Sequence, residues 1–234
     1  MKYTTYLFDF DYTLADSSRG IVICFRNVLE RHGHTGISDE AIKRTIGKTL
    51  EDSFSLLSGI TAPETLAEYK KEYVKEADTY MTVNTFFFPE TVTVLKTLKS
   101  QGAQIGIIST KFRFRIREMV DQHFPKDFFD IIIGGEDVKQ AKPDPQGIKK
   151  ALRRLHRQKN ETLYIGDSTV DAETAQAAKV DFVGVLNGMT TREELIVYPH
   201  RQILDNLSLL PLIHKFTPYE PYNHFPRRSS SASD

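Results

Sequence analysis

The sequence of 234 residues predicts an α/β protein: a mainly parallel sheet with helices on both faces and a helical module inserted near the start of the chain. Two patterns predict this fold. From residue 89 onward, short apolar runs alternate with helical segments, which is typical of parallel strands joined by right-handed crossovers. Between residues 16 and 82, apolar side chains recur at helical spacing instead, so this part is predicted to be helical.

The first predicted strand covers residues 3–8, a run rich in aromatic and β-branched residues. Asp9 and Asp11 follow it directly. Because strand side chains alternate, the two carboxylates would share one side of the chain, at the strand end where α/β proteins bind ligands. Such a pair is unfavourable unless a cation or a shared proton relieves it. The pair therefore predicts a metal site.

The inserted module is predicted to contain several helices. Ser17 or Ser18 can cap the first, which would end at Gly33. Ser38 starts another, which would carry Ile42, Ile46 and Leu50 on one face. Residues 61–64 have the spacing of a capping box and would begin the last. The aromatic cluster over residues 86–88, where the chain returns to the sheet, is expected to be packing.

The rest of the sheet is predicted from the alternation after Pro89. A first helix would end at Gly102, since glycine commonly terminates helices. Strands are predicted over residues 104–109, 130–133, 163–166 and 182–185, with helices near 113–123, 146–156 and 171–179.

The last nineteen residues, 216–234, lack the periodicity of a core segment. Four aromatic residues nevertheless recur there at every third position among three prolines, which is the period of a polyproline II helix. Two interpretations stand: a strap that docks on this protein or on a partner, or an unstructured tail.

Composition excludes several classes of function. The 31 basic and 31 acidic residues cancel, so neither a nucleic acid nor a membrane surface is expected as a partner. The single cysteine, Cys24, fits a reducing compartment, and no apolar run approaches the ~20 residues of a membrane span. No leader is expected before the first strand. We expect a cytoplasmic monomer or homodimer.

Three further polar segments follow predicted strands at the same edge of the sheet. The segment 109–111 offers hydroxyls and a cation, and Lys142 lies at the mouth of a helix. Asp167 and Asp171 follow the strand over residues 163–166. Each alone is equally compatible with a helix cap or a structural ion pair. Together, and in this order along the chain, the segments specifically indicate a functional site.

The set resembles the four motifs of the haloacid-dehalogenase-like phosphohydrolase superfamily. Residues 9–13 resemble the first motif, Ser109 the second, Lys142 the third, and Asp167 with Asp171 the fourth. The resemblance covers about residues 3–214 and is strongest to the phosphoglycolate-phosphatase-like branch. It implies a Rossmann-like core over residues 1–15 and 83–215, a helical cap over residues 16–82, and a separate tail over residues 216–234.

The resemblance implies a role for each charged residue. Asp9 would be the nucleophile that forms an aspartyl-phosphate, and Asp11 would protonate the leaving oxygen and then activate water. Ser109 would donate a hydrogen bond to a phosphoryl oxygen. Lys142 would balance charge on the nucleophile and the phosphate.

A Mg²⁺ cofactor is expected at the same site. Four carboxylates and a phosphate monoester with about two negative charges cannot be offset by Lys142 alone. The resemblance assigns the metal to Asp9, the backbone carbonyl of Asp11, and Asp167, with Asp171 mainly supporting. An oxygen-only set of this kind suits Mg²⁺.

Substrate-binding residues are expected in the cap and in the loops that face it. Residues 47–50 resemble the cap loop that approaches the active site, which makes Lys48 a candidate for binding an anionic leaving group. Thr110, Lys111 and Arg19 are further candidates. For Arg19 an ordinary solvated surface cation is the favoured interpretation.

Tyr12 departs from the family pattern, which usually has glycine there. The turn must accept a side chain without the freedom of glycine, and the ring would point towards the cap interface. We expect the fine geometry and the substrate of this protein to differ at this residue.

The function expected is a Mg²⁺-dependent phosphatase acting on a small phosphorylated metabolite. Phosphoglycolate, pyrophosphate, nucleotides and sugar phosphates all remain open as substrates. One alternative is a sugar phosphomutase, but similar mutases carry a histidine where this chain has residues 20–22, Gly-Ile-Val. A non-catalytic phosphate-binding regulatory module is the other alternative.

Overall fold

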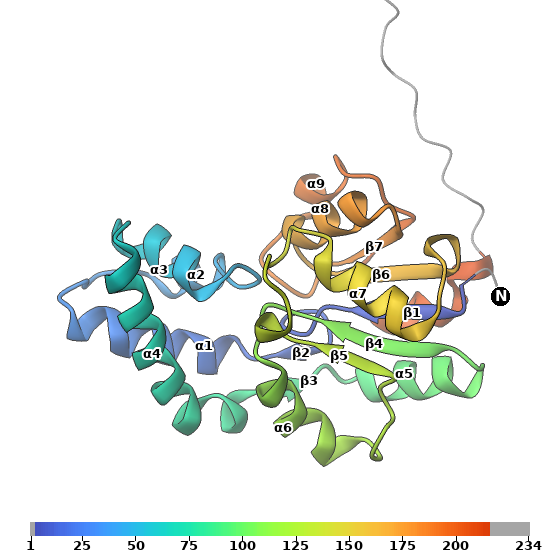
Figure 1. Cartoon of the computed structure of the whole chain (residues 1–234), viewed down its shortest axis with the longest axis horizontal. Coiled ribbons are helices and arrows are strands. Elements are labelled where there is room, and N and C mark those ends of the chain that lie inside the picture. Colours follow the sequence, from blue (N-terminus) through green and yellow to red (C-terminus); the bar gives the residue numbers. More distant parts are fainter. Residues whose placement is uncertain (1–2, 216–234) are drawn as a thin grey trace, which may run out of the picture.

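The structure is a computed structural model that describes residues 3–215. Six parallel strands form one sheet in the order β5-β4-β1-β6-β7-β8 (Figure 1). The strands are β1 (Thr5–Phe8), β4 (Gln104–Ile108), β5 (Ile131–Ile133), β6 (Thr162–Gly166), β7 (Asp181–Val185) and β8 (Gln202–Leu204). The predicted α/β class is confirmed. β8 was not predicted, because three residues are too few to show a period.

Helices cover both faces of the sheet. One face packs against α5 (Thr91–Ser100), α6 (Arg113–His123) and the 3₁₀ segment η4 (Leu207–Lys215). The other packs against α7 (Gln146–Leu155), α8 (Thr169–Ala178) and α9 (Arg192–Leu195). Short 3₁₀ turns are η1 (Thr82–Asn84), η2 (Gly135–Asp137) and η3 (Lys159–Glu161).

The central strand β1 is buried on both faces. Tyr6 and Phe8 belong to one apolar cluster and Leu7 to the other, as the alternation of strand side chains requires. Leu7 pairs with Gly106 of β4 on one side and with Tyr164 of β6 on the other. Since all three strands are parallel, the loops that follow them meet at one edge of the sheet.

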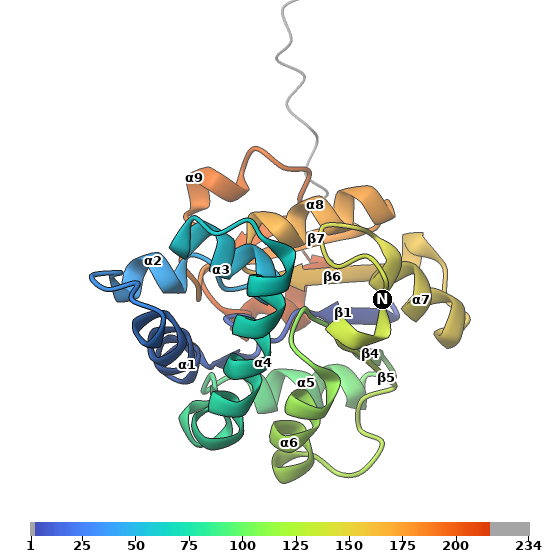
Figure 2. The ribbon, with the colours of Figure 1, turned by 60° about the vertical axis from the view of Figure 1, so that its left-hand side comes forward.

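The inserted module is a cluster of four helices at one end of the sheet (Figure 1). They are α1 (Ser18–Arg31), α2 (Asp39–Lys43), α3 (Leu50–Ser58) and α4 (Pro63–Tyr80). Figure 2 brings this cluster forward, with the sheet behind it. It has its own apolar core, in which the rings of Phe25, Phe54 and Tyr73 pack with centroids 4.6 to 6.2 Å apart.

Two short antiparallel strands connect the helical cluster to the sheet. β2 (Ala15–Asp16) leads into α1, and β3 (Phe86–Phe87) leads back. The predicted packing of the aromatic cluster holds for Phe87, which meets Phe10 and Phe124. It is wrong for Phe86, which is 64% exposed because nothing covers that face of the two-stranded pair within residues 3–215.

Helix starts follow the sequence in part. Ser38 caps α2 as predicted, by accepting the N–H of Ala41. The capping box over residues 61–64 is wrong: Ala62 precedes α4 without a side-chain cap, and Pro63 begins the helix. Proline is favoured there because its missing N–H would have no helical partner.

The other expectations have mixed outcomes. Cys24 is fully buried in the helical cluster, and burial raises the pKa of its thiol to about 12, so it is a packing residue. No helix within residues 3–215 is long and apolar enough to cross a membrane. The expected strap or tail over residues 216–234 lies outside the described residues.

Candidate active site

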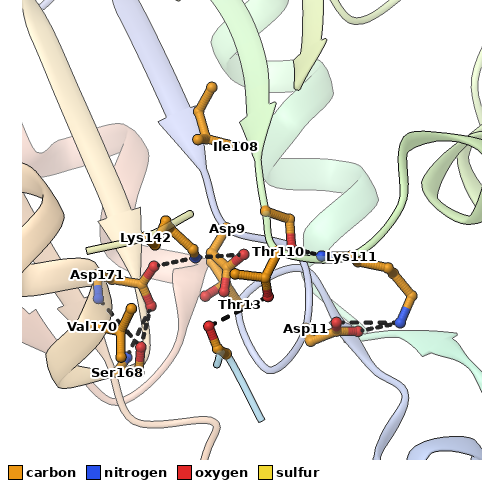
Figure 3. Close-up of polar contacts among 12 residues, drawn as sticks. Asp9, Asp11, Thr13, Ile108, Thr110, Lys111, Lys142, Ser168, Val170 and Asp171 are labelled. Atoms are coloured by element: carbon orange, nitrogen blue, oxygen red, sulfur yellow. Dashed lines mark hydrogen bonds and ion pairs between the residues drawn. The ribbon is translucent and has the colours of Figure 1, made fainter. Parts of the chain in front are cut away.

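A buried cluster of charges lies at the carboxyl edge of the sheet (Figure 3). Carboxylate oxygens of Asp9, Asp167 and Asp171 lie within 4.8 Å of one another. The Lys142 ammonium lies between two of them, 3.0 Å from Asp9 Oδ1 and 2.6 Å from Asp171 Oδ1. The structure thus brings together three segments of the sequence. Asp9 follows β1, Asp167 and Asp171 come after β6, and Lys142 lies in the loop before α7.

Asp9 is deeply buried at the end of the central strand. The residue is 2% exposed, and its backbone N–H donates to Ile165 of β6 at 2.9 Å, which extends the strand pairing to the site. Its Oδ1 has no hydrogen-bond partner within residues 3–215, although the Lys142 ammonium is close enough for an ion pair. Burial raises the pKa of Asp9 to about 7, and Lys142 opposes that shift. Lys142 therefore offsets only part of the cost of burying the charged Asp9 carboxylate.

Asp171 uses both of its carboxylate oxygens to accept hydrogen bonds from neighbouring side chains. Its Oδ1 accepts from Lys142 and from the Tyr164 hydroxyl at 2.9 Å, and its Oδ2 accepts from the hydroxyl of Ser168 at 2.6 Å. A Cβ on Gly166 would lie 2.3 Å from the Asp171 Cβ, so only glycine allows this packing. With both oxygens bonded, Asp171 holds Lys142 in place.

Asp167 has one oxygen fixed and one available. Thr13 donates to its Oδ1 at 3.1 Å. Its Oδ2 has no hydrogen-bond partner in the described part of the chain, and the backbone at Gly188 passes so close that a Cβ there would lie 2.2 Å away. Burial, with Asp171 and Asp9 adding to it, raises the pKa of Asp167 well above its usual range.

The structure separates Asp11 from this cluster. Its carboxylate accepts two contacts from the Lys111 ammonium, at 2.9 and 3.2 Å, and a hydrogen bond from the Ser17 hydroxyl. Ser17 occupies the N-cap position of α1, as predicted, but its side chain makes no cap bond to the helix and bonds to Asp11 instead. Asp9 and Asp11 therefore lie in different environments, one beside Lys142 and the other beside Lys111.

Tyr12 occupies the left-handed region of backbone space, with φ of +60°. Its N–H donates to Ala15 at 2.7 Å and closes the turn after the strand. The side chain is buried, and burial raises the pKa of its hydroxyl to about 12. With Arg44 and Ile46 of the helical cluster it lines a small cavity that also includes Asp167. The ring thus lies where the helical cluster meets the sheet.

The remaining candidates fall into two groups. Ser109 is buried, and its hydroxyl accepts the N–H of Lys111 at 3.3 Å. Lys48, Thr110 and Lys111 line a cavity of about 280 Å³ that Asp11 also lines. Arg19 is exposed on α1 and outside that lining, so the structure does not bring it to the other candidates.

Four supporting residues were not recognised in the sequence: Thr13, Ser17, Tyr164 and Ser168. A signal existed for Ser168, because Ser168 and Asp171 have the spacing of a capping box, which α8 forms. Tyr164 gave none, since a tyrosine within an apolar strand is indistinguishable from core.

The cluster has the chemistry of a divalent cation site. Three buried carboxylates face one ammonium, which lies 3.0 Å from Asp9 Oδ1, and one oxygen of Asp167 accepts no hydrogen bond within residues 3–215. An uncompensated buried carboxylate is costly, and hard oxygen ligands suit Mg²⁺. Asp9 and Asp167 could hold the ion.

Sequence comparison agrees with this geometry. Residues 6–185 match the family model of the haloacid dehalogenase-like hydrolases. The chain is 31% identical over 223 residues to a protein of Bacillus mycoides named pyrophosphatase PpaX, covering 92% of this chain and 99% of that protein.

Solved structures show the same fold. A haloacid dehalogenase-like hydrolase from Bacteroides fragilis is 62% identical, with a TM-score of 0.88 over 89% of this chain and all of that one. A structure from Haemophilus somnus named as a phosphoglycolate phosphatase has a TM-score of 0.83 over 92% of this chain and 99% of that one. At 17% identity, that second likeness concerns the fold alone.

Proposed function

The chain belongs to the haloacid dehalogenase-like hydrolase family, among its phosphatases, and we propose that it hydrolyses a small phosphorylated metabolite with Mg²⁺ through an aspartyl-phosphate on Asp9. One observation carries the proposal. Asp9 is buried at the end of the central strand, beside Lys142 and within reach of Asp167. In the proposal, Asp9 is the nucleophile, Lys142 the fixed cation and Asp167 a metal ligand, and their proximity supports these roles.

In the proposed reaction, an oxygen of Asp9 attacks phosphorus and the bond from phosphorus to the leaving oxygen breaks. Lys142, fixed by Asp171, stabilises the negative charge on the phosphoryl group, and Ser109 donates to one of its oxygens. Mg²⁺, held by Asp9, Asp167 and the backbone carbonyl of Asp11, would supply further neutralisation of that charge.

Asp11 is the proton carrier in this proposal. It lines the 280 Å³ cavity, where the leaving group would lie, whereas Asp9 belongs to the buried cluster. Asp11 gives a proton to the leaving oxygen and later takes one from the water that attacks the phosphoenzyme. Its ion pair with Lys111 must loosen for this, so substrate would replace part of that contact.

We propose that residues 16–82 act as a cap over a core formed by residues 1–15 and 83–215. Contacts between the two parts on the side of the active site include the Thr110 hydroxyl, which donates to the Gly47 carbonyl at 3.3 Å, and Arg44, which lies 3.6 Å from Glu194. Closure of this kind excludes bulk water while the phosphoenzyme exists.

Lys48 is proposed to meet the phosphoryl group. Its ammonium has no hydrogen-bond or ion-pair partner within residues 3–215. It lines both the 280 Å³ cavity and the small cavity that includes Asp167, so it lies between the leaving-group space and the metal-binding side. Arg19 is exposed and is assigned no role in the proposal.

The test is Mg²⁺-dependent release of phosphate from a set of phosphate esters. We expect Asp9→Asn to lower kcat by at least about a thousandfold, because an amide is a far weaker nucleophile than a carboxylate. Asp205→Asn is the matched control, since the Asp205 side chain is 86% exposed and far from the cluster in the chain. Full turnover by Asp9→Asn would disprove the assignment of the nucleophile.

A second measurement separates hydrolase from phosphomutase. Acid quenching during turnover should trap label from a radiolabelled phosphate ester on the wild-type protein and none on Asp9→Asn. Phosphate should accumulate in solution whether or not a second sugar phosphate is present. Label that leaves the protein only when a sugar phosphate is added would favour the mutase.

A further inference from the structure

The 280 Å³ cavity beside Asp11 lies between the helical cluster and the core. Its walls come from α1, α4 and the loop before α3 on one side, and from residues 110–112 on the other. Taking ~30 Å³ for each water, it has room for roughly nine water-sized units. A leaving phosphate or glycolate has only a few heavy atoms and would fill a minor part of it.

The walls are mainly apolar. Three segments of the helical cluster contribute six apolar side chains to the lining: Ile21, Ile46, Leu50, Val74, Ala77 and Met81. Phe112 closes the side of the core, with the Lys70 ammonium 5.8 Å from its ring centroid. Such walls favour an apolar ligand, because its burial releases water from both surfaces.

The lining cations other than Lys48 are already paired within residues 3–215. Lys70 lies 2.7 Å from Glu51, and Lys111 is bound to Asp11. The Arg115 guanidinium lies 3.0 Å from Glu118 and also contacts Asp78. A second anionic group on a ligand would therefore have to break an existing ion pair to find a cation in the depth of this cavity.

Glu136, the other acid in the wall, is also engaged. It accepts the backbone N–H of Arg113 at 2.9 Å, at the start of α6. Lys48 alone among the lining cations has no partner in residues 3–215, and it lies towards the side of Asp167. The free cation thus suits the phosphoryl group rather than the distal part of a leaving group.

Tyr73 adds one neutral polar group to the wall. It is 7% exposed, and its hydroxyl has no hydrogen-bond partner within residues 3–215. Its ring is held by Phe25 and Phe54 at centroid distances of 4.8 and 6.2 Å. Burial raises the pKa of the hydroxyl well above its usual range, so the group stays neutral. A buried tyrosine hydroxyl generally has a partner, and a ligand can supply it here.

We propose that the substrate is a phosphate monoester of an alcohol with an apolar body that fills this cavity and one neutral polar group that hydrogen-bonds to Tyr73. The inference rests on the proposed phosphatase function and narrows its substrate class. Pyrophosphate and phosphoglycolate are poor substrates on this view, because their leaving groups bury a charge and leave the apolar walls uncovered.

The test uses a series of n-alkyl phosphates from ethyl to hexyl, with pyrophosphate and phosphoglycolate alongside. The alcohols are nearly equal as leaving groups, so differences in kcat/KM report burial of the chain. We expect kcat/KM to rise about fourfold for each methylene, the usual effect of burying one. Hexyl phosphate should exceed both pyrophosphate and phosphoglycolate.

Two leucines of α3 provide a matched pair of variants. Leu50 lines the cavity, whereas Leu56 is 65% exposed and outside its lining. Leu50→Ala should lower the ratio of kcat/KM for hexyl over ethyl phosphate by roughly tenfold, since contacts with the distal chain are lost. Leu56→Ala should leave that ratio unchanged.

Tyr73→Phe tests the polar group. It should lower kcat/KM for 6-hydroxyhexyl phosphate by roughly three- to tenfold, the usual effect of one neutral hydrogen bond, and leave hexyl phosphate unchanged. An equal loss for both substrates would show that Tyr73 acts only through packing and would overturn its role.

The outcomes separate this inference from the proposed function. A flat alkyl series with faster turnover of pyrophosphate or phosphoglycolate would overturn the inference and leave the phosphatase in place. A series that rises equally in Leu50→Ala would overturn the assignment to this cavity. No phosphate from any compound in the series would remove the proposed function, and the substrate class with it.

Discussion

At the scale of single residues, the turn after β1 combines two unusual demands. Tyr12 has a positive φ, which is unfavourable for a residue with a side chain, yet its ring is buried where the helical cluster meets the sheet. Gly188 approaches both Tyr12 and Asp167 so closely that a side chain there would collide with each. Gly188 and the Tyr12 turn therefore pack together beside Asp167, the carboxylate proposed to hold the metal.

Replacing Tyr12 should separate backbone strain from ring burial. Tyr12→Ala loses the ring and keeps the strain, so we expect it to lower the free energy of unfolding by about 2–3 kcal/mol. Tyr12→Gly also loses the ring but relieves the left-handed conformation, and should be more stable than Tyr12→Ala by about 1 kcal/mol. Urea denaturation measures both. An alanine variant as stable as the glycine variant would show that the turn is not strained.

Gly188→Ala should displace Asp167 and weaken both activity and metal affinity by at least about tenfold. The reason is the 2.2 Å separation between the added Cβ and Asp167 Oδ2. Gly36→Ala is the control: Gly36 has a φ of +77° but nothing within 4 Å of an added Cβ, so it costs stability only. Kinetics and Mg²⁺ titration of both variants check this, and normal Mg²⁺ affinity in Gly188→Ala would contradict it.

The charged residues of the site could be predicted because Asp9 and Asp167 directly follow strands, and because Lys142 and Asp171 fall in the order of the family's motifs along the chain. Their partners could not. The pairing of Lys111 with Asp11 depends on how two loops far apart in the chain meet. The hydroxyl of Ser17 could equally have capped α1, and only the fold shows that it turns to Asp11 instead.

At the scale of elements, helix and strand periods identified most segments, and local breaks caused the errors. The helix expected to carry Ile42, Ile46 and Leu50 is two helices. α2 ends at Lys43, Gly47 adopts a φ of +98°, and Thr49 caps α3 through the N–H of Asp52. Apolar spacing continues across the break because both helices face the same core, so periodicity alone could not reveal it.

The helical cluster depends on its aromatic core. Phe54 is fully buried against Phe25, Tyr69 and Tyr73. Phe54→Ala should lower the free energy of unfolding by about 3–5 kcal/mol, through lost burial and a cavity. Phe86→Ala is the control and should change it by no more than about 0.5 kcal/mol, because that ring is largely exposed. Equal effects in denaturant titrations would show that the cluster contributes little to the measured stability.

At the scale of the whole molecule, the buried carboxylates of Asp9 and Asp167 should make the free energy of unfolding depend on a bound cation. Burial raises the pKa values of Asp9 and Asp167, so their charged forms destabilise the metal-free fold. A cation that binds only the folded state relieves this cost.

We therefore expect Mg²⁺ at a hundredfold excess over its Kd to stabilise the protein by about 2.7 kcal/mol, which raises Tm by roughly 5–10 °C for a chain of this size. EDTA should reverse the change. Asp167→Asn should abolish it, and Asp205→Asn should keep it. An equal rise of Tm in Asp167→Asn would show that Mg²⁺ stabilises the protein from another place.

The pairing of β2 with β3 has a mechanical consequence. Both crossings between the helical cluster and the sheet run side by side, with Ala15 opposite Phe87 and Asp16 opposite Phe86. Two adjacent, hydrogen-bonded crossings resist sliding and stretching but permit rotation about their common line. We therefore expect the helical cluster to rotate as a unit about the line of the two paired strands. Such a rotation would open the contact between Gly47 and Thr110, and we expect substrate to enter there.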